Sequence, residues 1–223
     1  MASTSAGLFE AIEADDVDRV RALLAEDASL AAARDADGVS ALMRARYRFD
    51  RAVIEAVAAA APSLDVFEAT SFGDLERLTE LLMFDPALVT TYSADGFTAL
   101  HFAAFFGQAE AAGFLLDRGA DVDAAGRGWM TGTALHSAAS SRHSDIVARL
   151  LDAGAEPDAR QGQGWTALHS AARNGDLASV EALLAAGADA TAANDEGASV
   201  RDLAAEGGDE ATISAIDRAL ARP

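Results

Sequence analysis

The sequence contains no cysteine, so the chain can form neither a disulfide nor a thiolate metal site. It therefore gives no indication of an oxidising compartment. Lysine is absent as well, and all 17 cationic residues are arginine. The arginine bias and the abundance of alanine indicate a high-GC genome, and from them we expect a bacterial source.

Long hydrophobic runs and an excess of positive charge are also missing. No stretch of about 20 apolar residues occurs, and the first ten residues lack the basic and apolar segments of a secretory signal. We therefore expect a cytoplasmic protein with no membrane contact. The formal net charge is -19 at pH 7. Because binding to a phosphate backbone requires a basic stripe, a nucleic-acid partner is not expected.

Aromatic residues make up only 6% of the chain, although 51% of the residues are hydrophobic. The apolar share is carried largely by alanine, with leucine and valine behind it. Such a composition favours small, closely packed helices over a thick sheet sandwich. A chain of 223 residues is long enough to bury a sizeable core.

A cassette of about 33 residues occurs three times. It begins with Thr-Ala-Leu-His at Thr98, Thr133 and Thr166, at spacings of 35 and 33 residues. An alanine pair, a leucine pair and a Gly-Ala pair follow in the same order each time. These pairs begin at Ala103, Ala138 and Ala171, at Leu115, Leu150 and Leu183, and at Gly119, Gly154 and Gly187.

Physical chemistry accounts for these residue types. Threonine is a good helix N-cap, and the alanine pairs allow a neighbouring helix to approach closely. The leucine pairs place a second helix against the core, and the glycines can take the left-handed conformation that ends a helix. Each helix would have two or three turns, so its stability must come from stacking one cassette on the next.

The cassette resembles the ankyrin repeat, whose signature is T-P-L-H-x-A followed by two antiparallel helices in about 33 residues. The proline of that signature is alanine in all three cassettes, and alanine is also comfortable at the start of a helix. The resemblance implies an all-α solenoid of stacked helix-turn-helix repeats with short, hairpin-like turns.

The rest of the chain carries weaker copies. A fourth cassette starts near Asn194, where the charged Arg201 replaces a core leucine, as expected for a capping repeat with one face in water. A shift of 58 positions superposes the first residues on the region from residue 65. Leu8-Phe9-Glu10-Ala11 then falls on Val66-Phe67-Glu68-Ala69, and Asp37-Gly38 falls on Asp95-Gly96.

We therefore predict a single domain of seven stacked cassettes over residues 1–223. The cassettes are 1–34 (N-terminal cap), 35–64 (short and degenerate), 65–92 (degenerate), 93–127, 128–160 and 161–193 (regular) and 194–223 (C-terminal cap). Cassette 35–64 lacks the Leu-Leu and Gly-Ala pairs. Its second helix is expected near residues 51–60, and we expect a bend or an irregular stack there.

The histidines are predicted to be structural. His101, His136 and His169 occupy the position at which, by resemblance, the imidazole ties adjacent turns together. They would lie about one repeat apart, on the order of 10 Å, which is too far for one metal ion with bonds near 2 Å. His143 is expected on the surface, in contact with solvent. We expect neither a metal nor a cofactor.

We also find no catalytic constellation. Ser137, His136 and Asp145 are residue types of a hydrolase triad, but they lie on consecutive helices without a G-x-S-x-G elbow. The glycines at 126–128 and 162–164 are not followed by Gly-Lys-Ser or Gly-Lys-Thr, so they are turn glycines and not phosphate loops. The acidic residues show no calcium-loop spacing and suggest a solvated surface. The chain is therefore not expected to be an enzyme.

One basic cluster occurs, at residues 44–51. The 58-residue register places it on the first helix of a cassette, where Arg44, Arg48 and Arg51 would share a face. Two alternatives remain open: pairing with carboxylates of this acidic chain, or docking of an acidic group of a partner.

By resemblance, ankyrin repeats bind partners on a concave face formed by the turn tips and the exposed positions of the first helices. Scarce aromatic residues gather at these positions, and such rings are typical of binding hot spots, although some of them could instead pack over neighbouring turns. The candidate partner-binding residues are Phe97, Phe105, Phe106, Trp129, Met130, Trp165, Arg173 and Asn174, with Tyr47 and Arg48 in the early repeat.

These observations predict a monomeric, non-catalytic adaptor, regulator or inhibitor that binds another protein. The alternative is a pocket in which Trp129, Trp165 and Phe106 stack on a small planar molecule. A ligand that shifts the melting temperature would favour the pocket, and a protein that co-purifies at fixed stoichiometry would favour the adaptor.

Overall fold

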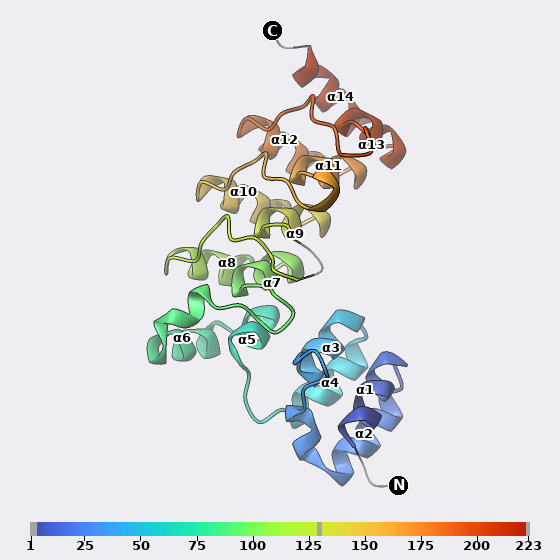
Figure 1. Ribbon diagram of the computed structural model, residues 1–223, viewed down its shortest axis with the longest axis vertical. Helices are drawn as coiled ribbons and strands as arrows, with labels where there is room; N and C mark the ends of the chain where they lie inside the picture. Colours follow the sequence, from blue (N-terminus) through green and yellow to red (C-terminus); the bar gives the residue numbers. More distant parts are fainter. Residues whose placement is uncertain (1–3, 129–130, 222–223) are drawn as a thin grey trace.

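The computed structural model describes residues 4–128 and 131–221, and fourteen α-helices lie within these ranges (Figure 1). They follow one another as seven pairs, in which we term the first helix inner and the second outer. The inner helices are α1 (Ser5–Glu13), α3 (Ala41–Arg48), α5 (Val66–Phe72), α7 (Ala99–Phe106), α9 (Ala134–Ser140), α11 (Ala167–Arg173) and α13 (Val200–Gly207). The outer helices are α2 (Val17–Glu26), α4 (Arg51–Ala60), α6 (Leu75–Phe84), α8 (Ala109–Leu116), α10 (Ser144–Asp152), α12 (Leu177–Ala185) and α14 (Glu210–Leu220).

The pairs are stacked so that like helices touch. Inner helix α7 packs on α9, α9 on α11 and α11 on α13, while the outer helices α10, α12 and α14 pack in the same order. Short 3₁₀ helices, η1 (Ala28–Ala32), η2 (Pro86–Thr90) and η3 (Gly162–Gly164), precede three of the inner helices. The predicted fold class, an all-α solenoid, is confirmed. In the part of the chain that the structure describes, no helix is both long and apolar enough to cross a membrane.

Turn tips connect each outer helix to the next inner helix. Single antiparallel bridges, Arg34 with Ser40, Tyr92 with Thr98 and Ala193 with Ser199, close three of these tips. The connection between α4 and α5 is different, because it consists of residues 61–65 without such a bridge. A hairpin tip is therefore missing at this one point of the stack.

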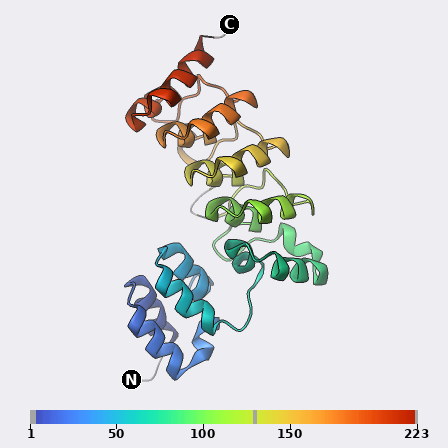
Figure 2. The same cartoon turned by 180° about the vertical axis from the view of Figure 1, so that it is seen from behind.

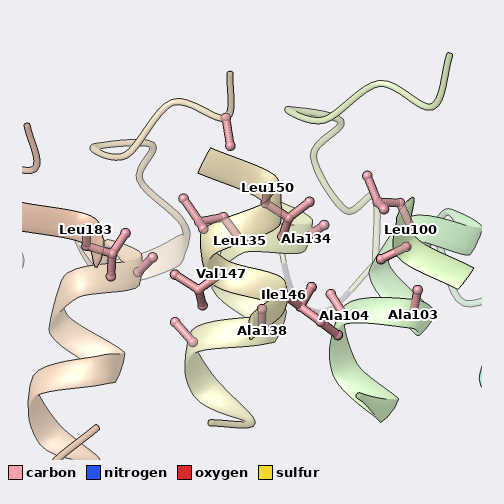
Figure 3. Close-up of a cluster of buried hydrophobic side chains, with 14 of the residues drawn as sticks. Leu100, Ala103, Ala104, Ala134, Leu135, Ala138, Ile146, Val147, Leu150 and Leu183 are labelled. Carbon is pink, nitrogen blue, oxygen red and sulfur yellow. The ribbon is translucent and has the colours of Figure 1, made fainter. Parts of the chain in front are cut away.

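Small residues set the spacing of the regular repeats. Ala103, Ala104 and Ala138 are fully buried between neighbouring inner helices, and Leu135 fills the layer behind them (Figure 3). Outer helix α10 contributes Ile146, Val147 and Leu150, which point into the same layer. The apolar stripe of each short helix is thus covered by the next repeat, which is the stabilisation that the sequence requires.

The first four helices form a separate block. Residues 4–61, the N-terminal block, surround a core of their own that includes Leu8, Leu42 and Val57. A second and larger core runs through α5 to α14, the main stack. The contact of α3 with α5 is much smaller than that of α5 with α7. Figure 2 shows the block set to one side of the main stack and joined to it by the short linker.

The short cassette has both of its helices. Helix α4 spans Arg51–Ala60, which is the range expected for the uncertain second helix. The irregularity expected in this cassette lies after α4, where the linker replaces a tip. One detail of the prediction is wrong: Arg51 does not share a helix with Arg44 and Arg48, because α3 ends at Arg48 and Arg51 begins α4.

Candidate functional site

The aromatic residues expected on the concave face gather at the junction of the N-terminal block and the main stack. Phe97 and Phe102 of the main stack form a small apolar cluster with Val39 and Met43 of the block. Phe97 is only 5% exposed, and its ring meets Phe102 edge-on at 6.1 Å between centroids. The expectation that Phe97 lies on an open surface is therefore wrong, because other parts of the chain cover its ring.

Phe106 is also packed within the chain. Its ring stacks on Tyr47 of the N-terminal block at 6.1 Å and on Phe102 at 6.4 Å. The guanidinium carbon of Arg46 lies 4.3 Å from the Phe106 ring centre. Phe106 and Tyr47 were both predicted to contact a partner protein, but in the folded chain the two rings contact each other.

Tyr47 makes a further link across the junction. Its hydroxyl donates a hydrogen bond to the carboxylate of Asp95 in a tip of the main stack. Burial and the neighbouring Asp95 carboxylate raise the pKa of the Tyr47 hydroxyl above its ordinary value. Tyr47 is consequently a neutral donor at physiological pH, and its bond to Asp95 holds two segments that are distant in sequence.

Two rings remain accessible beside this cluster. Phe105 is half-buried at the end of α7, and Phe49 is 63% exposed at the end of α3. The ring of Phe49 lies 6.0 Å from both Phe105 and Phe106. Phe49 was missed by the sequence analysis, although it occupies the helix-end position at which α5 has Gly73 and α7 has Gly107.

The backbone at Phe49 is unusual. Its φ of 60° is in the left-handed region, which glycine adopts freely and a bulky residue rarely does. Such a conformation costs of order 1 kcal/mol or more and persists where the surroundings or function require it. Phe49 thus combines a strained backbone with a mostly exposed ring at the edge of the inner face.

Another group of predicted residues lies further along the inner face. The Arg173 guanidinium carbon is 5.7 Å from the Trp165 ring centre, and Trp165 also faces His169 at 5.8 Å. Arg173 is exposed and belongs to none of the ion pairs found among the described residues. Asn174 donates to the carbonyl oxygens of Ala139 and Ser140 and so ties α11 to α9. Trp129 and Met130 lie outside the described residues.

The basic cluster is largely paired within the chain. Arg48 forms a bidentate ion pair with Asp15. Arg44 pairs with Asp35 and Asp37, and Arg51 pairs with Glu55. These contacts support intramolecular pairing, one of the two alternatives left open by the sequence. Arg46 is the exception. Burial lowers the pKa of its guanidinium, and no acidic side chain offsets this effect.

Three buried histidines occupy the same position of the repeat, and two of them use both ring nitrogens in hydrogen bonds. The backbone N–H of Thr98 donates to Nδ1 of His101 at 3.3 Å, so this nitrogen is an acceptor and Nε2 carries the proton. Nε2 then donates to the carbonyl of Gly132 in the next tip, at 3.0 Å. His136 repeats the pattern with Thr133 and with the carbonyl of Trp165. Burial lowers the pKa of both imidazoles, so they are neutral ties between tips.

This geometry leaves His136 no free nitrogen for general-base catalysis. In the described ranges no group of three His, Cys, Asp or Glu residues is arranged to hold a metal ion. His143, expected in contact with solvent, is half-buried, and its Nε2 donates to the carbonyl of Phe105 at 3.2 Å. It therefore also ties one inner-helix end to the next.

Comparison with known families identifies the repeats. Residues 66–161 and 127–194 match the family model described as "Ankyrin repeats (3 copies)". The chain belongs to the ankyrin-repeat family. The matched residues all lie in the main stack, so the N-terminal block is the part of this ankyrin-repeat protein that departs most from the family pattern.

Two curated relatives are similar to a part of this chain. The chain is 47% identical over 66 residues to "Probable E3 ubiquitin-protein ligase XBOS31" and 44% identical over 66 residues to "E3 ubiquitin-protein ligase XB3", both from rice (Oryza sativa subsp. japonica). Each match covers 28% of this chain and 14% of the relative. Both relatives are plant proteins, and the bacterial source expected from composition stays a prediction.

Proposed function

We propose that this ankyrin-repeat protein is a non-catalytic module that binds a partner protein on its inner face. The observation that carries the proposal is the set of accessible groups at the ends of inner helices. The mostly exposed Phe49 lies against the half-buried Phe105, and Arg173 lies near Trp165 and belongs to no ion pair among the described residues. Aromatic residues and arginine are the residue types that dominate binding hot spots.

Energetic cost supports a binding role for Phe49 in particular. Its ring is exposed to water, and its backbone is in a conformation that glycine would adopt without strain. Neither feature contributes to folding. Partner contact would bury the ring and offset both costs, which is the usual relation between strain and a functional site.

Support for binding instead of catalysis comes from the histidines. Backbone groups occupy both ring nitrogens of His101 and His136, and burial lowers the pKa of these two imidazoles, which favours their neutral form. The ubiquitin-ligase activity named for the rice relatives belongs to proteins of which the match covers 14%. The proposal for this chain therefore concerns recognition of a partner protein, and its cytoplasmic location and monomeric state stay predictions.

The alternative pocket between Trp129, Trp165 and Phe106 receives less support. Phe106 contacts the rings of Tyr47 and Phe102, and the Arg46 guanidinium carbon lies 4.3 Å from its ring centre. Groups of the chain itself therefore occupy much of the space that a planar molecule would need. Trp165 is instead engaged with His169 and Arg173. Saturation with a planar ligand that raised the melting temperature would restore this alternative.

A matched pair of variants tests the proposal. Partners are captured from the source organism with the full chain, and the affinity for the recovered protein is then measured by titration. The double variant Phe105→Ala with Arg173→Ala should bind at least about 30-fold more weakly, which corresponds to about 2 kcal/mol. The control, Met83→Ala with Phe84→Ala, changes two exposed residues of outer helix α6 and should bind normally. Equal affinity of both variants would exclude the inner face.

A further inference from the structure

The junction between the N-terminal block and the main stack differs in chemistry from every regular repeat interface. Regular repeats bury Ala, Leu, Ile and Val side chains against each other. The junction instead joins Tyr47 to Phe106 and places the Arg46 guanidinium between the rings of Phe72 and Phe106, at 4.7 and 4.3 Å. Tyrosine, phenylalanine and arginine are typical of surfaces at which separate proteins dock.

Polar ties complete this junction. The Ser40 hydroxyl donates to Glu68 Oε1 at 2.6 Å, and Arg34 pairs with Asp65 at 3.1 Å. The Arg46 guanidinium donates to the carbonyl of Ser71, but its Nε is buried without a hydrogen-bond partner. An interface that leaves a buried guanidinium Nε without a partner is held less firmly than a fully satisfied core.

The missing tip explains where the block lies. Because residues 61–65 form no hairpin, the tip of the block closes directly on the tip of the main stack. A Cβ added to Gly38 would lie 3.0 Å from the Cβ of Ala94. On the outer side, α4 makes no contact with α6 comparable to that of α2 with α4. The two units are thus joined on the inner side and by the linker.

The position of the block has a consequence for the inner face. Helix α3 packs beside α5, and its side chains reach the rings of α7. Met43 and Tyr47 pack with Phe97 and Phe102, and Phe102 is 3% exposed. An internal helix therefore occupies the part of the inner face that carries most of the rings.

We infer that residues 4–61 act as a hinged clamp, which docks through α3 on the rings of α7 and opens about the linker 61–65. The block has its own core, which includes Leu42 and Val57, so it keeps its fold when the junction parts. Opening breaks the Tyr47, Arg46 and Ser40 contacts and uncovers Phe102 and Phe106. The two states differ in the contacts of the junction, and a change in the balance between them is a population shift.

The inference goes beyond the proposed function and deepens it in one respect, which rests on that function. A partner that needs the rings of α7 must bind the open form, because α3 occupies them in the closed form. The chemistry of α3 also describes such a partner: an amphipathic helix with an aromatic ring and a neighbouring arginine, as in Tyr47 and Arg46. A partner confined to Phe105 and Arg173 would bind either form.

The absence of native cysteine makes the clamp directly measurable in the full chain. Arg21→Cys on α2 and Glu181→Cys on α12 are both at exposed positions and carry a pair of spin labels. Electron-electron distance measurements then report the separation of the block from the main stack. The labelled parent should show one dominant distance.

Two independent variants release the clamp from opposite sides. Tyr47→Ala removes the contact from the block, and Phe106→Ala removes it from the main stack. Each should add a longer distance whose population rises at least tenfold over that of the parent. The control Met83→Ala with Phe84→Ala, on the exposed surface of α6, should leave the distances unchanged.

Hydrogen exchange on the same samples separates opening from unfolding. If the clamp opens, the amides of α1 to α4 stay protected while the longer distance appears. Unchanged distances in both variants would show a rigid attachment and overturn the inference, and so would loss of protection throughout the block. None of these readouts needs a partner, so failure of the clamp is distinct from failure of partner binding by Phe105 and Arg173.

Discussion

The third residue of the inner helix makes different contacts in the two regions of this molecule. In the main stack it is His101 or His136, whose Nε2 donates to a carbonyl of the next tip. In the N-terminal block it is Met43, which packs on the Phe97 and Phe102 cluster. No hairpin tip follows this block, so no tip carbonyl is available there. A missing turn thus replaces a hydrogen-bonded tie with an aromatic contact.

Glu68 shows the transition between the two arrangements. It stands at the equivalent position of α5, where its carboxylate accepts from the backbone N–H of Asp65, as the histidine ring does in later repeats. Its other oxygen accepts from Ser40 of the block behind it instead of bonding to the tip ahead. Burial raises the pKa of the Glu68 carboxyl. The bond to the N-cap backbone is therefore kept in both regions, whereas the contact between neighbouring repeats depends on whether a hairpin tip follows.

The largest effect is expected from removal of the last pair of helices. Deleting residues 194–223 uncovers the apolar faces of α11 and α12, which Val200, Ala204 and Ile216 now cover. The loss of stability should exceed that of any single core substitution, about 5 kcal/mol, and the protein should aggregate. Light scattering and denaturant unfolding check this result. A soluble truncated chain of parental stability would show that the pair is not a cap.

A pair of equivalent leucines then tests whether the two regions unfold separately. Leu42 in the block and Leu168 in the main stack are both fully buried at the same repeat position. Each change to alanine should cost about 2–5 kcal/mol. In Leu42→Ala the faster hydrogen exchange should be confined to α1–α4, and in Leu168→Ala it should spread through α7–α14. Equal acceleration over the whole chain in both variants would mean one cooperative unit.

The histidine ties should have a smaller effect. His136→Ala leaves the N-cap N–H of Thr133 and the carbonyl of Trp165 without their partner. The expected loss is about 1–3 kcal/mol in thermal or denaturant unfolding, with partner affinity nearly unchanged in the folded protein. Weaker binding with an unaltered melting curve would contradict the structural role of His136.

The smallest effect concerns pH and again separates the regions. Burial lowers the pKa of His101, His136 and His169, all in the main stack, relative to the unfolded value of 6.5. Below about pH 6.5 these histidines bind protons more readily in the unfolded chain than in the folded chain. The histidines' contribution to the free energy of unfolding therefore falls as pH falls. His136→Gln removes one such group and should lose less stability than the parent between pH 7.5 and 5.5. Denaturant unfolding at both values measures it, and identical pH dependence would contradict it.

The repeating chemistry could be predicted from the sequence because it is local. The threonine, histidine, alanine and leucine spacings fix where helices start, which faces are apolar and how each repeat meets the next. They predicted the solenoid and the structural role of His101 and His136. The accessibility of Phe97, Phe106 and Tyr47 was predicted wrongly, because the covering groups lie about 50 residues away along the chain.

The repeat, its helices and its capping residues follow from the sequence alone, since each depends on neighbours three to about 33 positions away. Met43 at the histidine position and the short linker 61–65 were the signals of an altered junction, but they do not state which surface the block covers. That the side chains of α3 cover rings of α7 became visible in the folded chain alone. Periodicity in a sequence reports which side of a helix is buried, whereas the partner that buries it follows from the path of the whole chain.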